Sequence, residues 1–83
     1  MKHAKVIVLW REGLHLRYAV KLVKVAQGFR STIVLRGNGR IADLRSIISV
    51  LALCATVGNV LDVEVSGEDE QDAAQSVEQV FVE

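Results

Sequence analysis

The sequence of 83 residues has no proline and a single cysteine, with one Trp, one Tyr and two Phe as its only aromatic residues. One cysteine allows no internal disulfide and no Cys-x-x-Cys motif for redox or metal chemistry. The cytoplasm is the default compartment for such a chain. Because Cys54 lies in an apolar run, we expect it to be a small core residue.

Long apolar runs are also missing. The longest, such as Val6–Trp10 and Val50–Ala55, fall far short of the ~20 residues that a helical membrane span requires. The run after the N-terminus is too short for the core of a signal peptide. We therefore expect no membrane insertion and a cytoplasmic location.

Basic residues are absent from the second half of the chain, although the net charge is zero. All ten Lys and Arg lie in residues 1–45, and eight of the ten acids lie in residues 46–83. Such asymmetry is typical of a surface that meets an anionic partner, here on the basic half. It is weaker support in one small domain, because both halves can interleave in space.

A hydrophobic fraction of 51% is ample for a folded chain, and the length fits one domain over residues 1–83 with a modest core. Lys2 to Trp10 reads as a strand that is apolar on both faces near its end, as in a central strand. The 3.6-residue period predicts a helix over Leu16–Gln27, with Leu16 in its apolar stripe. Gly28 is expected to end this helix in a left-handed conformation.

Further along, Ser31–Arg36 and Arg40–Asp43 read as strands joined by an Asn-Gly turn, a strong hairpin signal. A second helix is expected over about Ile47–Cys54, with Ser46 as its N-cap. Val60–Ser66 alternates as a half-buried strand, and a third helix follows Gly67. The order β-α-β-β-α-β-α predicts an α+β open-faced β-sandwich, with a four-stranded, mainly antiparallel sheet and three helices on one face.

Residues 13–19 read Gly-Leu-His-Leu-Arg-Tyr-Ala, which places His15 where a loop becomes a helix. A helix N-terminus presents free N–H groups that bind anions, phosphate especially. An imidazole nucleophile and the cation of Arg17 at the same place indicate phosphoryl chemistry on His15. The alternative is a capping or surface histidine without chemistry.

The pattern Gly13-Leu14-His15-x-Arg17-x-Ala19 resembles the active-site signature of the histidine-containing phosphocarrier (HPr) family of the bacterial phosphotransferase system. Similar residues continue along essentially the whole chain. They are Gly28-Phe29, Asn38-Gly39, Ser46 and the Gly-Glu-Asp-Glu run at residues 67–70.

This resemblance implies a phosphoryl carrier, which is a protein substrate and not an enzyme, with no cofactor and no metal. His15 would accept a phosphoryl group on Nδ1 from enzyme I, itself phosphorylated by phosphoenolpyruvate, and pass it to IIA domains. Arg17 would stabilise the phosphate. Ser46 matches a regulatory site that HPr kinase/phosphorylase modifies in many members, and an ordinary N-cap is an equal alternative for it.

The resemblance also implies a partner-binding surface, an apolar patch rimmed by positive charge, on a protein that we expect to be a monomer. The residues assigned to it are Leu16, Tyr18, Lys21, Lys24, Ile47, Ile48 and Leu51. Two of them depart from the family, which usually has Thr or Ala in place of Leu16 and Pro in place of Tyr18. Either change can alter how the imidazole is held or which partners dock.

Two other interpretations of the sequence compete with the phosphoryl carrier. One is an HPr-like regulatory module that binds a kinase or a transcription regulator according to phosphorylation of Ser46 or His15, without sugar transport. The sequence leaves the choice between transport and regulation open. The other, a ferredoxin-like metal or nucleic-acid module, lacks both a Cys-x-x-Cys motif and the exposed strand aromatics of RNA-binding sheets. We therefore expect no nucleic-acid partner.

Overall fold

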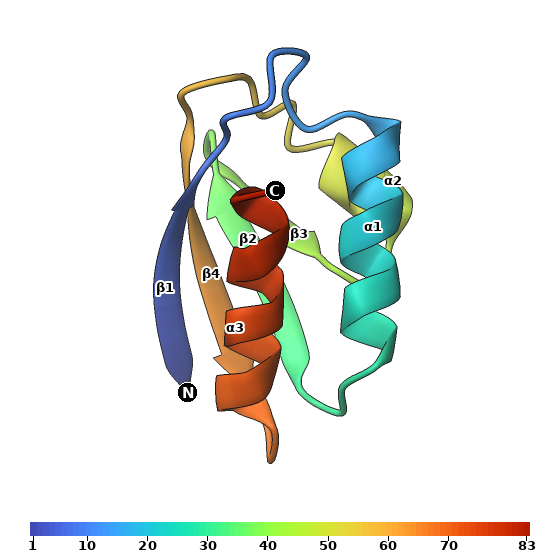
Figure 1. The fold of residues 1–83 in the computed structure, drawn as a ribbon, viewed down its shortest axis with the longest axis vertical. Helices are drawn as coiled ribbons and strands as arrows, with labels where there is room; N and C mark the ends of the chain where they lie inside the picture. The colour runs from blue at the N-terminus through green and yellow to red at the C-terminus, as the bar shows by residue number, and fades with distance from the viewer.

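In the computed structural model, which describes residues 1–83, three helices cover one face of a four-stranded antiparallel sheet (Figure 1). The strands lie in the order β1-β4-β2-β3. This arrangement confirms the predicted α+β open-faced sandwich. In chain order the elements are β1 (Lys2–Ile7), α1 (Leu16–Gln27), β2 (Thr32–Gly37), β3 (Arg40–Asp43), α2 (Ile47–Leu51), β4 (Val60–Ser66) and α3 (Glu70–Phe81). None of the helices is both long and apolar enough to cross a bilayer.

Strand β4 is central and follows its sequence pattern, since Leu61, Val63 and Val65 are buried under the helices. The prediction of a central strand at Lys2–Trp10 was wrong: β1 lies at the edge of the sheet and ends at Ile7. Ile7 is 43% exposed, so the apolar residues on the second face of this segment meet solvent rather than a second layer.

The core is a cluster of 22 buried residues, to which α1 contributes Ala19, Leu22 and Ala26. Leu16, expected in the buried stripe of α1, is instead 58% exposed because it stands in the first turn, beyond the sheet-facing stripe. Gly28 caps α1 in the right-handed region, with φ −80° and ψ −3°, so the predicted left-handed cap was wrong.

Helix α2 is shorter than predicted, ending at Leu51 instead of Cys54. Side chains of the β2–β3 hairpin bind carbonyls of the segment that follows α2: Asn38 Nδ2 donates to Leu53 O at 3.1 Å, and Arg40 Nη1 donates to Ala52 O at 2.6 Å. Cys54 has a φ of +52° and is exposed. The core position expected for Cys54 is taken by Leu53, which is buried.

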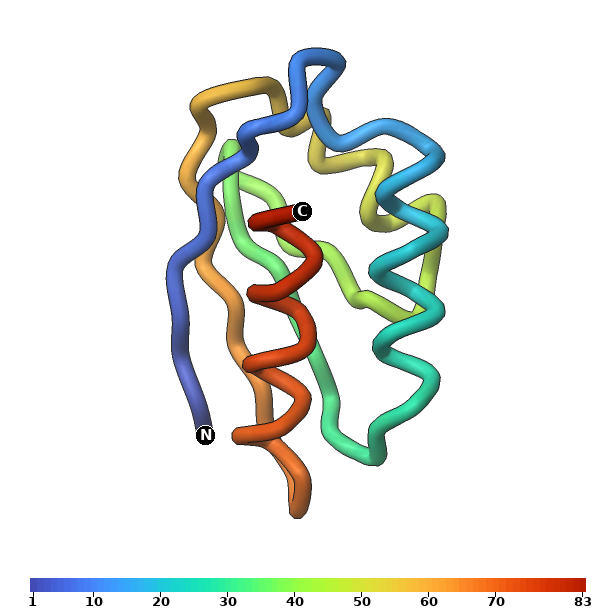
Figure 2. The backbone as a smooth tube through the Cα atoms, viewed as in Figure 1, coloured from blue at the N-terminus to red at the C-terminus, as the bar shows by residue number.

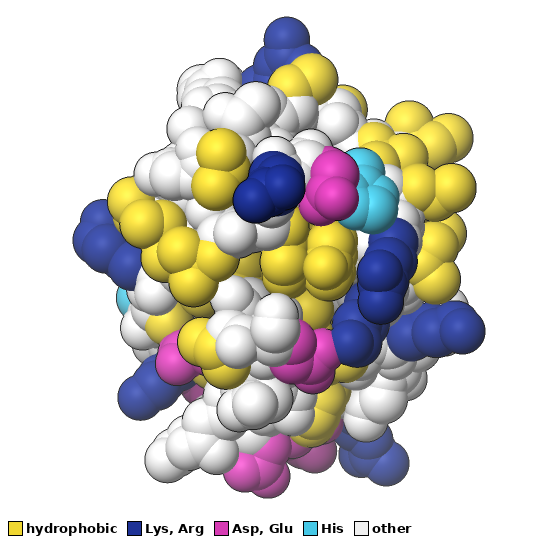
Figure 3. All heavy atoms as spheres, turned by 45° about the horizontal axis from the view of Figure 1, so that its top comes forward, with side chains coloured by type: hydrophobic (Ala, Val, Ile, Leu, Met, Phe, Trp, Pro, Cys, Tyr) yellow, Lys and Arg dark blue, Asp and Glu magenta, His cyan; other side chains and the backbone are white.

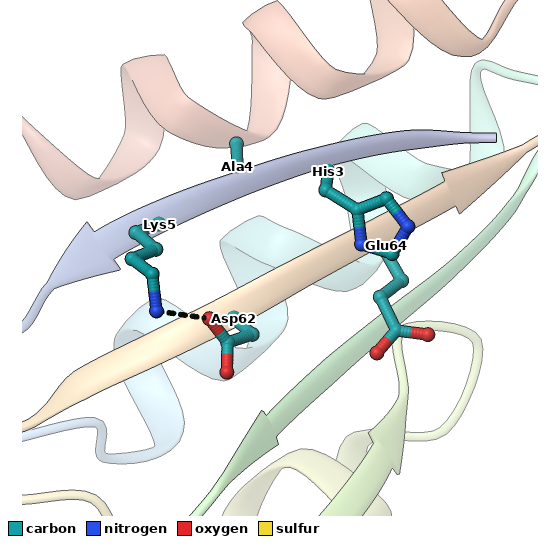
Figure 4. Close-up of a pocket in the computed structure, with 5 residues that line it drawn as sticks. All are labelled: His3, Ala4, Lys5, Asp62 and Glu64. Carbon is teal, nitrogen blue, oxygen red and sulfur yellow. Dashed lines mark hydrogen bonds and ion pairs between the residues drawn. The ribbon is translucent and has the colours of Figure 1, made fainter.

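The face of the sheet opposite the helices is open and polar near its middle (Figure 4). Lys5 Nζ lies 3.0 Å from Asp62 Oδ1, across the β1–β4 pair. His3 lies opposite Glu64 in the same register. Exposed pairs of this kind contribute little to stability, about 0–1 kcal/mol each.

At the end of the sheet near the start of α3, Asp69 joins two segments that are distant in the sequence. Its carboxylate accepts hydrogen bonds from the Ser31 hydroxyl, from Arg30 N–H at 2.9 Å and from Ser31 N–H at 3.0 Å. The Ser31 hydroxyl first, and then the two N–H groups, hold the pKa of Asp69 below its ordinary value of 3.8. Gly67 permits this approach, because a Cβ there would lie 2.6 Å from Ser31 Oγ.

We expect the Asp69→Ala variant to lose part of the pH dependence of folding stability. The folded pKa lies below the unfolded one, so the contribution of Asp69 is complete above the unfolded value and disappears as pH falls through the folded value. Melting temperatures measured between about pH 7 and pH 3 should therefore fall less steeply in the variant than in the parent. Ser31→Ala, which keeps both backbone donors, should give an intermediate slope. Parallel curves for parent and Asp69→Ala would contradict this account.

Candidate functional site

The loop that leads into α1 is fixed by a second loop, residues 52–59, which runs beside it at the same end of the molecule (Figure 2). Leu14 N–H donates to Ala55 O at 2.9 Å, and Val8 N–H donates to Asn59 O at 2.9 Å. Gly13 has a φ of +78°, and a Cβ at that position would lie 2.6 Å from Ala55 O. Only glycine fits this conformation and this close approach without strain.

His15 is the N-cap residue of α1, in an extended conformation with φ −100°. Its Nδ1 accepts a hydrogen bond from Arg17 N–H at 3.4 Å, and its Nε2 lies 3.9 Å from a carboxylate oxygen of Glu12. An accepting Nδ1 implies that the neutral ring carries its proton on Nε2. The side chain is 40% exposed, so the ring is both held and accessible to solvent.

Cationic and apolar side chains surround this histidine. In Figure 3, which looks onto this end of the molecule, a histidine lies beside an acidic side chain, with basic side chains below it and an apolar group to its right. Arg17 is exposed and makes no ion pair with a carboxylate, and the first turn of α1 contains no acid. Lys24 is likewise exposed, whereas Lys21 pairs with Glu83, two residues after the end of α3.

Tyr18 contacts both His15 and Arg17. Its ring lies edge-on to the His15 imidazole, with 5.2 Å between centroids, and the Arg17 guanidinium carbon lies 5.6 Å from the Tyr18 centroid. Tyr18 in turn stacks on Trp10, with 3.8 Å between centroids and 7° between planes.

Two neighbours of the site were missed from the sequence. Trp10 was assigned to the end of a strand, but it is only 6% exposed and lies under Tyr18. Glu12 was counted only as a charge. Because Glu12 lies three residues before His15, the sequence does contain a signal that the two side chains are close. No local pattern in the sequence indicates that Trp10 stacks on Tyr18.

The remaining residues assigned to the site lie on α2 and in the first turns of α1, which are adjacent (Figure 1). Ile48 is 80% exposed, while Ile47 and Leu51 are partly buried against the core. Together with the exposed Leu16 they leave an apolar patch beside the basic side chains of α1. Ser46 is exposed, and its Oγ accepts a hydrogen bond from Ser49 N–H at 3.2 Å, as predicted for the N-cap of α2.

No group of three or more His, Cys, Asp and Glu side chains lies close enough together to hold a metal ion. The arrangement instead suits an anion, because a helix N-terminus and an unpaired guanidinium lie at one exposed place, and it sets a nucleophilic imidazole nitrogen beside them.

Comparison with known proteins agrees with this geometry. Residues 2–83 match the family model described as the PTS HPr component phosphorylation site. The chain is 37% identical over 81 residues to the phosphocarrier protein HPr of Xylella fastidiosa strain 9a5c, covering 98% of this chain and 91% of that protein. It is 35% identical over 81 residues to the phosphocarrier protein NPr of Proteus mirabilis, covering 96% and 90%.

A solved structure of the histidine-containing phosphocarrier protein of a mycoplasma superimposes with a TM-score of 0.93 at 30% identity, covering 98% of this chain and 92% of that one. Sequence and fold therefore agree over nearly the whole length of both chains. The chain belongs to the HPr family of phosphocarrier proteins of the phosphotransferase system, which carry phosphoryl groups and are not enzymes.

Proposed function

We propose that His15 accepts a phosphoryl group on Nδ1 from phosphorylated enzyme I and passes it to IIA domains of the phosphotransferase system. The observation that carries this proposal is the hydrogen bond from Arg17 N–H to His15 Nδ1. It directs the lone pair of the nucleophilic nitrogen toward the N-terminus of α1, where a bound phosphoryl group finds donors.

In the transfer, the Nδ1 lone pair attacks phosphorus and a P–N bond forms. The bond between phosphorus and the donor atom of enzyme I breaks, and its electron pair returns to enzyme I. The proton on Nε2 stays in place, facing Glu12. The second transfer, to a IIA domain, reverses these roles for the imidazole, which leaves with the electron pair of its P–N bond.

The phosphoryl charge is met by groups already at the site. Leu16 N–H has no partner, and Arg17 N–H is released from Nδ1 once that nitrogen is bonded to phosphorus. Both N–H groups lie in the first turn of α1, at the positive end of its dipole. The unpaired guanidinium of Arg17 supplies a full charge and up to two parallel hydrogen bonds.

Enzyme I and IIA domains bind, in this proposal, to the apolar patch formed by Leu16, Ile47, Ile48 and Leu51. The exposure of Leu16 and Ile48 supports this assignment, since such side chains gain most from burial by a partner. Tyr18 lies at the edge of the patch, and Lys21 and Lys24 give its rim a positive charge that suits acidic partners.

A second function, regulation through Ser46, has one supporting observation: the exposed Ser46 Oγ stands at the N-terminus of α2. A phosphate there adds about −1.5 to −2 charge where the helix tolerates it, and where it would repel acidic partners of the patch. In this regulatory role, HPr kinase/phosphorylase modifies Ser46, and a transcription regulator recognises the modified protein.

Substitution of His15 by Ala should abolish phosphorylation by enzyme I and phosphoenolpyruvate. The matched control is His3→Ala, which removes the only other histidine of the chain and should be labelled at the parent rate. Phosphorus NMR of the parent should show a phosphohistidine signal that disappears in the His15 variant. Equal labelling of His15→Ala and parent would overturn the proposal. Failure of the labelled parent to pass the group to any IIA domain would favour the regulatory role.

Replacement of Arg17 by Ala should slow phosphoryl transfer from enzyme I by about tenfold to hundredfold, because one charge-assisted contact to the phosphoryl group is lost. Lys24→Ala removes a cation about two turns further along the same face of α1 and should change the rate much less. Rapid-quench kinetics with labelled enzyme I would measure both. An Arg17→Ala rate equal to that of the parent would exclude Arg17 from the site.

The two roles of Ser46 can be separated by substitution. Ser46→Ala should lower the free energy of unfolding by about 1 kcal/mol, through loss of the N-cap, and leave transfer from enzyme I unchanged. Ser46→Asp should keep the cap and slow the transfer by placing a negative charge beside the patch. Chemical denaturation and transfer kinetics measure the two effects. Unimpaired transfer by Ser46→Asp would exclude the electrostatic route of regulation.

A further inference from the structure

The His15 ring has few strong polar restraints. Its Nδ1 hydrogen bond is long, at 3.4 Å, and the Glu12 carboxylate is 3.9 Å from Nε2. Neither contact alone fixes the plane of the imidazole. The imidazole also packs against the Tyr18 ring in a T-shaped arrangement, with 72° between the two planes.

Tyr18 has little freedom of its own. It is half-buried, and one face of its ring lies flat on Trp10. Trp10 is buried and also stacks on Phe81 of α3, with 5.1 Å between centroids. A continuous series of rings therefore runs from the core to the surface: Phe81, Trp10, Tyr18 and His15. Parallel and edge-on ring pairs of this kind are favourable and have defined geometry.

The indole N–H of Trp10 is buried and has no hydrogen-bond partner. Leaving a buried donor unpaired is unfavourable, and most buried Trp residues avoid it. The orientation of Trp10 is therefore set by its stacking partners and not by a hydrogen bond. The two stacking contacts place the Trp10 ring directly under Tyr18, next to the site.

We propose that the Trp10–Tyr18 stack is a positioning device that holds the His15 imidazole and the Arg17 guanidinium in the geometry for phosphoryl transfer. Proline, the usual family residue at position 18, restricts the first turn through its own ring. Tyr18 lacks that restraint and replaces it with contacts to both functional side chains. Trp10 and Tyr18 are positioning residues, since neither touches the phosphoryl group.

This inference rests on His15 as the phosphoryl acceptor. Two donors test it. Enzyme I must dock on the protein, whereas phosphoramidate is a small donor that needs no docking surface. With phosphoramidate protonated on its nitrogen, Nδ1 attacks phosphorus, neutral ammonia leaves with the electrons of the broken P–N bond, and the imidazole keeps its proton on Nε2.

We expect Tyr18→Leu to slow labelling by both donors by about tenfold to hundredfold, the size of effect that misplacement of a reacting group produces. Leucine is a good helix former, so α1 should remain intact. Tyr18→Phe keeps the ring and its stack on Trp10 and loses only the hydroxyl, so it should recover most of the rate that Tyr18→Leu loses with both donors. Phe29→Leu, an aromatic deletion at the far end of α1, is the control for stability alone.

Trp10→Leu should match the loss in Tyr18→Leu, and the double variant should be no slower than either single one, because the two rings act as a unit. Nitrogen NMR of His15 should show a single Nε2-protonated tautomer in the parent and in Tyr18→Phe, and a mixture of tautomers in Tyr18→Leu. This signature does not follow from lower stability.

The outcomes are distinct. A parent that neither donor phosphorylates on His15 defeats the proposed function itself. A normally labelled parent with an equally fast Tyr18→Leu variant defeats the positioning role alone. Slower transfer from enzyme I with unchanged labelling by phosphoramidate also overturns it, because Tyr18 would then act by docking.

Discussion

The location of His15 depends on the close packing of Gly13 against the backbone of Ala55. The Leu14 N–H donates a hydrogen bond to the Ala55 carbonyl, and a Cβ at position 13 would not fit between these two segments of the chain. The loop of residues 52–59, which contains Ala55, is itself held by Asn38 and Arg40 of the β2–β3 hairpin. Helix α1 therefore begins at a point fixed by contacts from distant parts of the chain, and the residue at that point becomes its N-cap. Sheet, turn and loop all contribute to a site that consists of a single imidazole and its immediate neighbours.

The two sides of that imidazole differ in electrostatic character. Nδ1 faces the N-terminus of α1, whose first turn has no acid, and Nε2 faces Glu12. A dianionic phosphoryl group on the Nδ1 side would meet backbone donors and Arg17, and on the Nε2 side it would meet a carboxylate. Like-charge repulsion therefore disfavours the Nε2 side, although solvent screens it at this exposed position. The placement of one acid before the helix, and none inside its first turn, thus supports transfer through Nδ1.

Features with a local cause were predictable from the sequence. The alternation of Val60–Ser66 and the period of Leu16–Gln27 gave strand and helix bounds that the structure reproduces, and Asn38-Gly39 adopts the positive φ values of a tight hairpin turn. The wrong predictions concern residues whose surroundings are set by distant parts of the chain. Cys54 reads as a core residue, but the turn that ends α2 exposes it. Trp10 reads as the end of a strand, and its stacking on Tyr18 depends on tertiary packing that no local pattern encodes.

The Trp10–Tyr18 stack links the site to the packing of α3, because Trp10 also stacks on Phe81. A proline in the first turn of a helix restricts the backbone through a covalent ring, and that restriction persists whatever the surroundings do. A tyrosine in that position has order only while its neighbours are packed. Here the neighbours are Trp10 and, beyond it, Phe81 at the end of α3, which packs on β1 and β4. The order of the imidazole is therefore coupled to the packing of α3 on the sheet. Any local opening that moves α3 away from the sheet would therefore also remove the support of the stack under Tyr18 and His15.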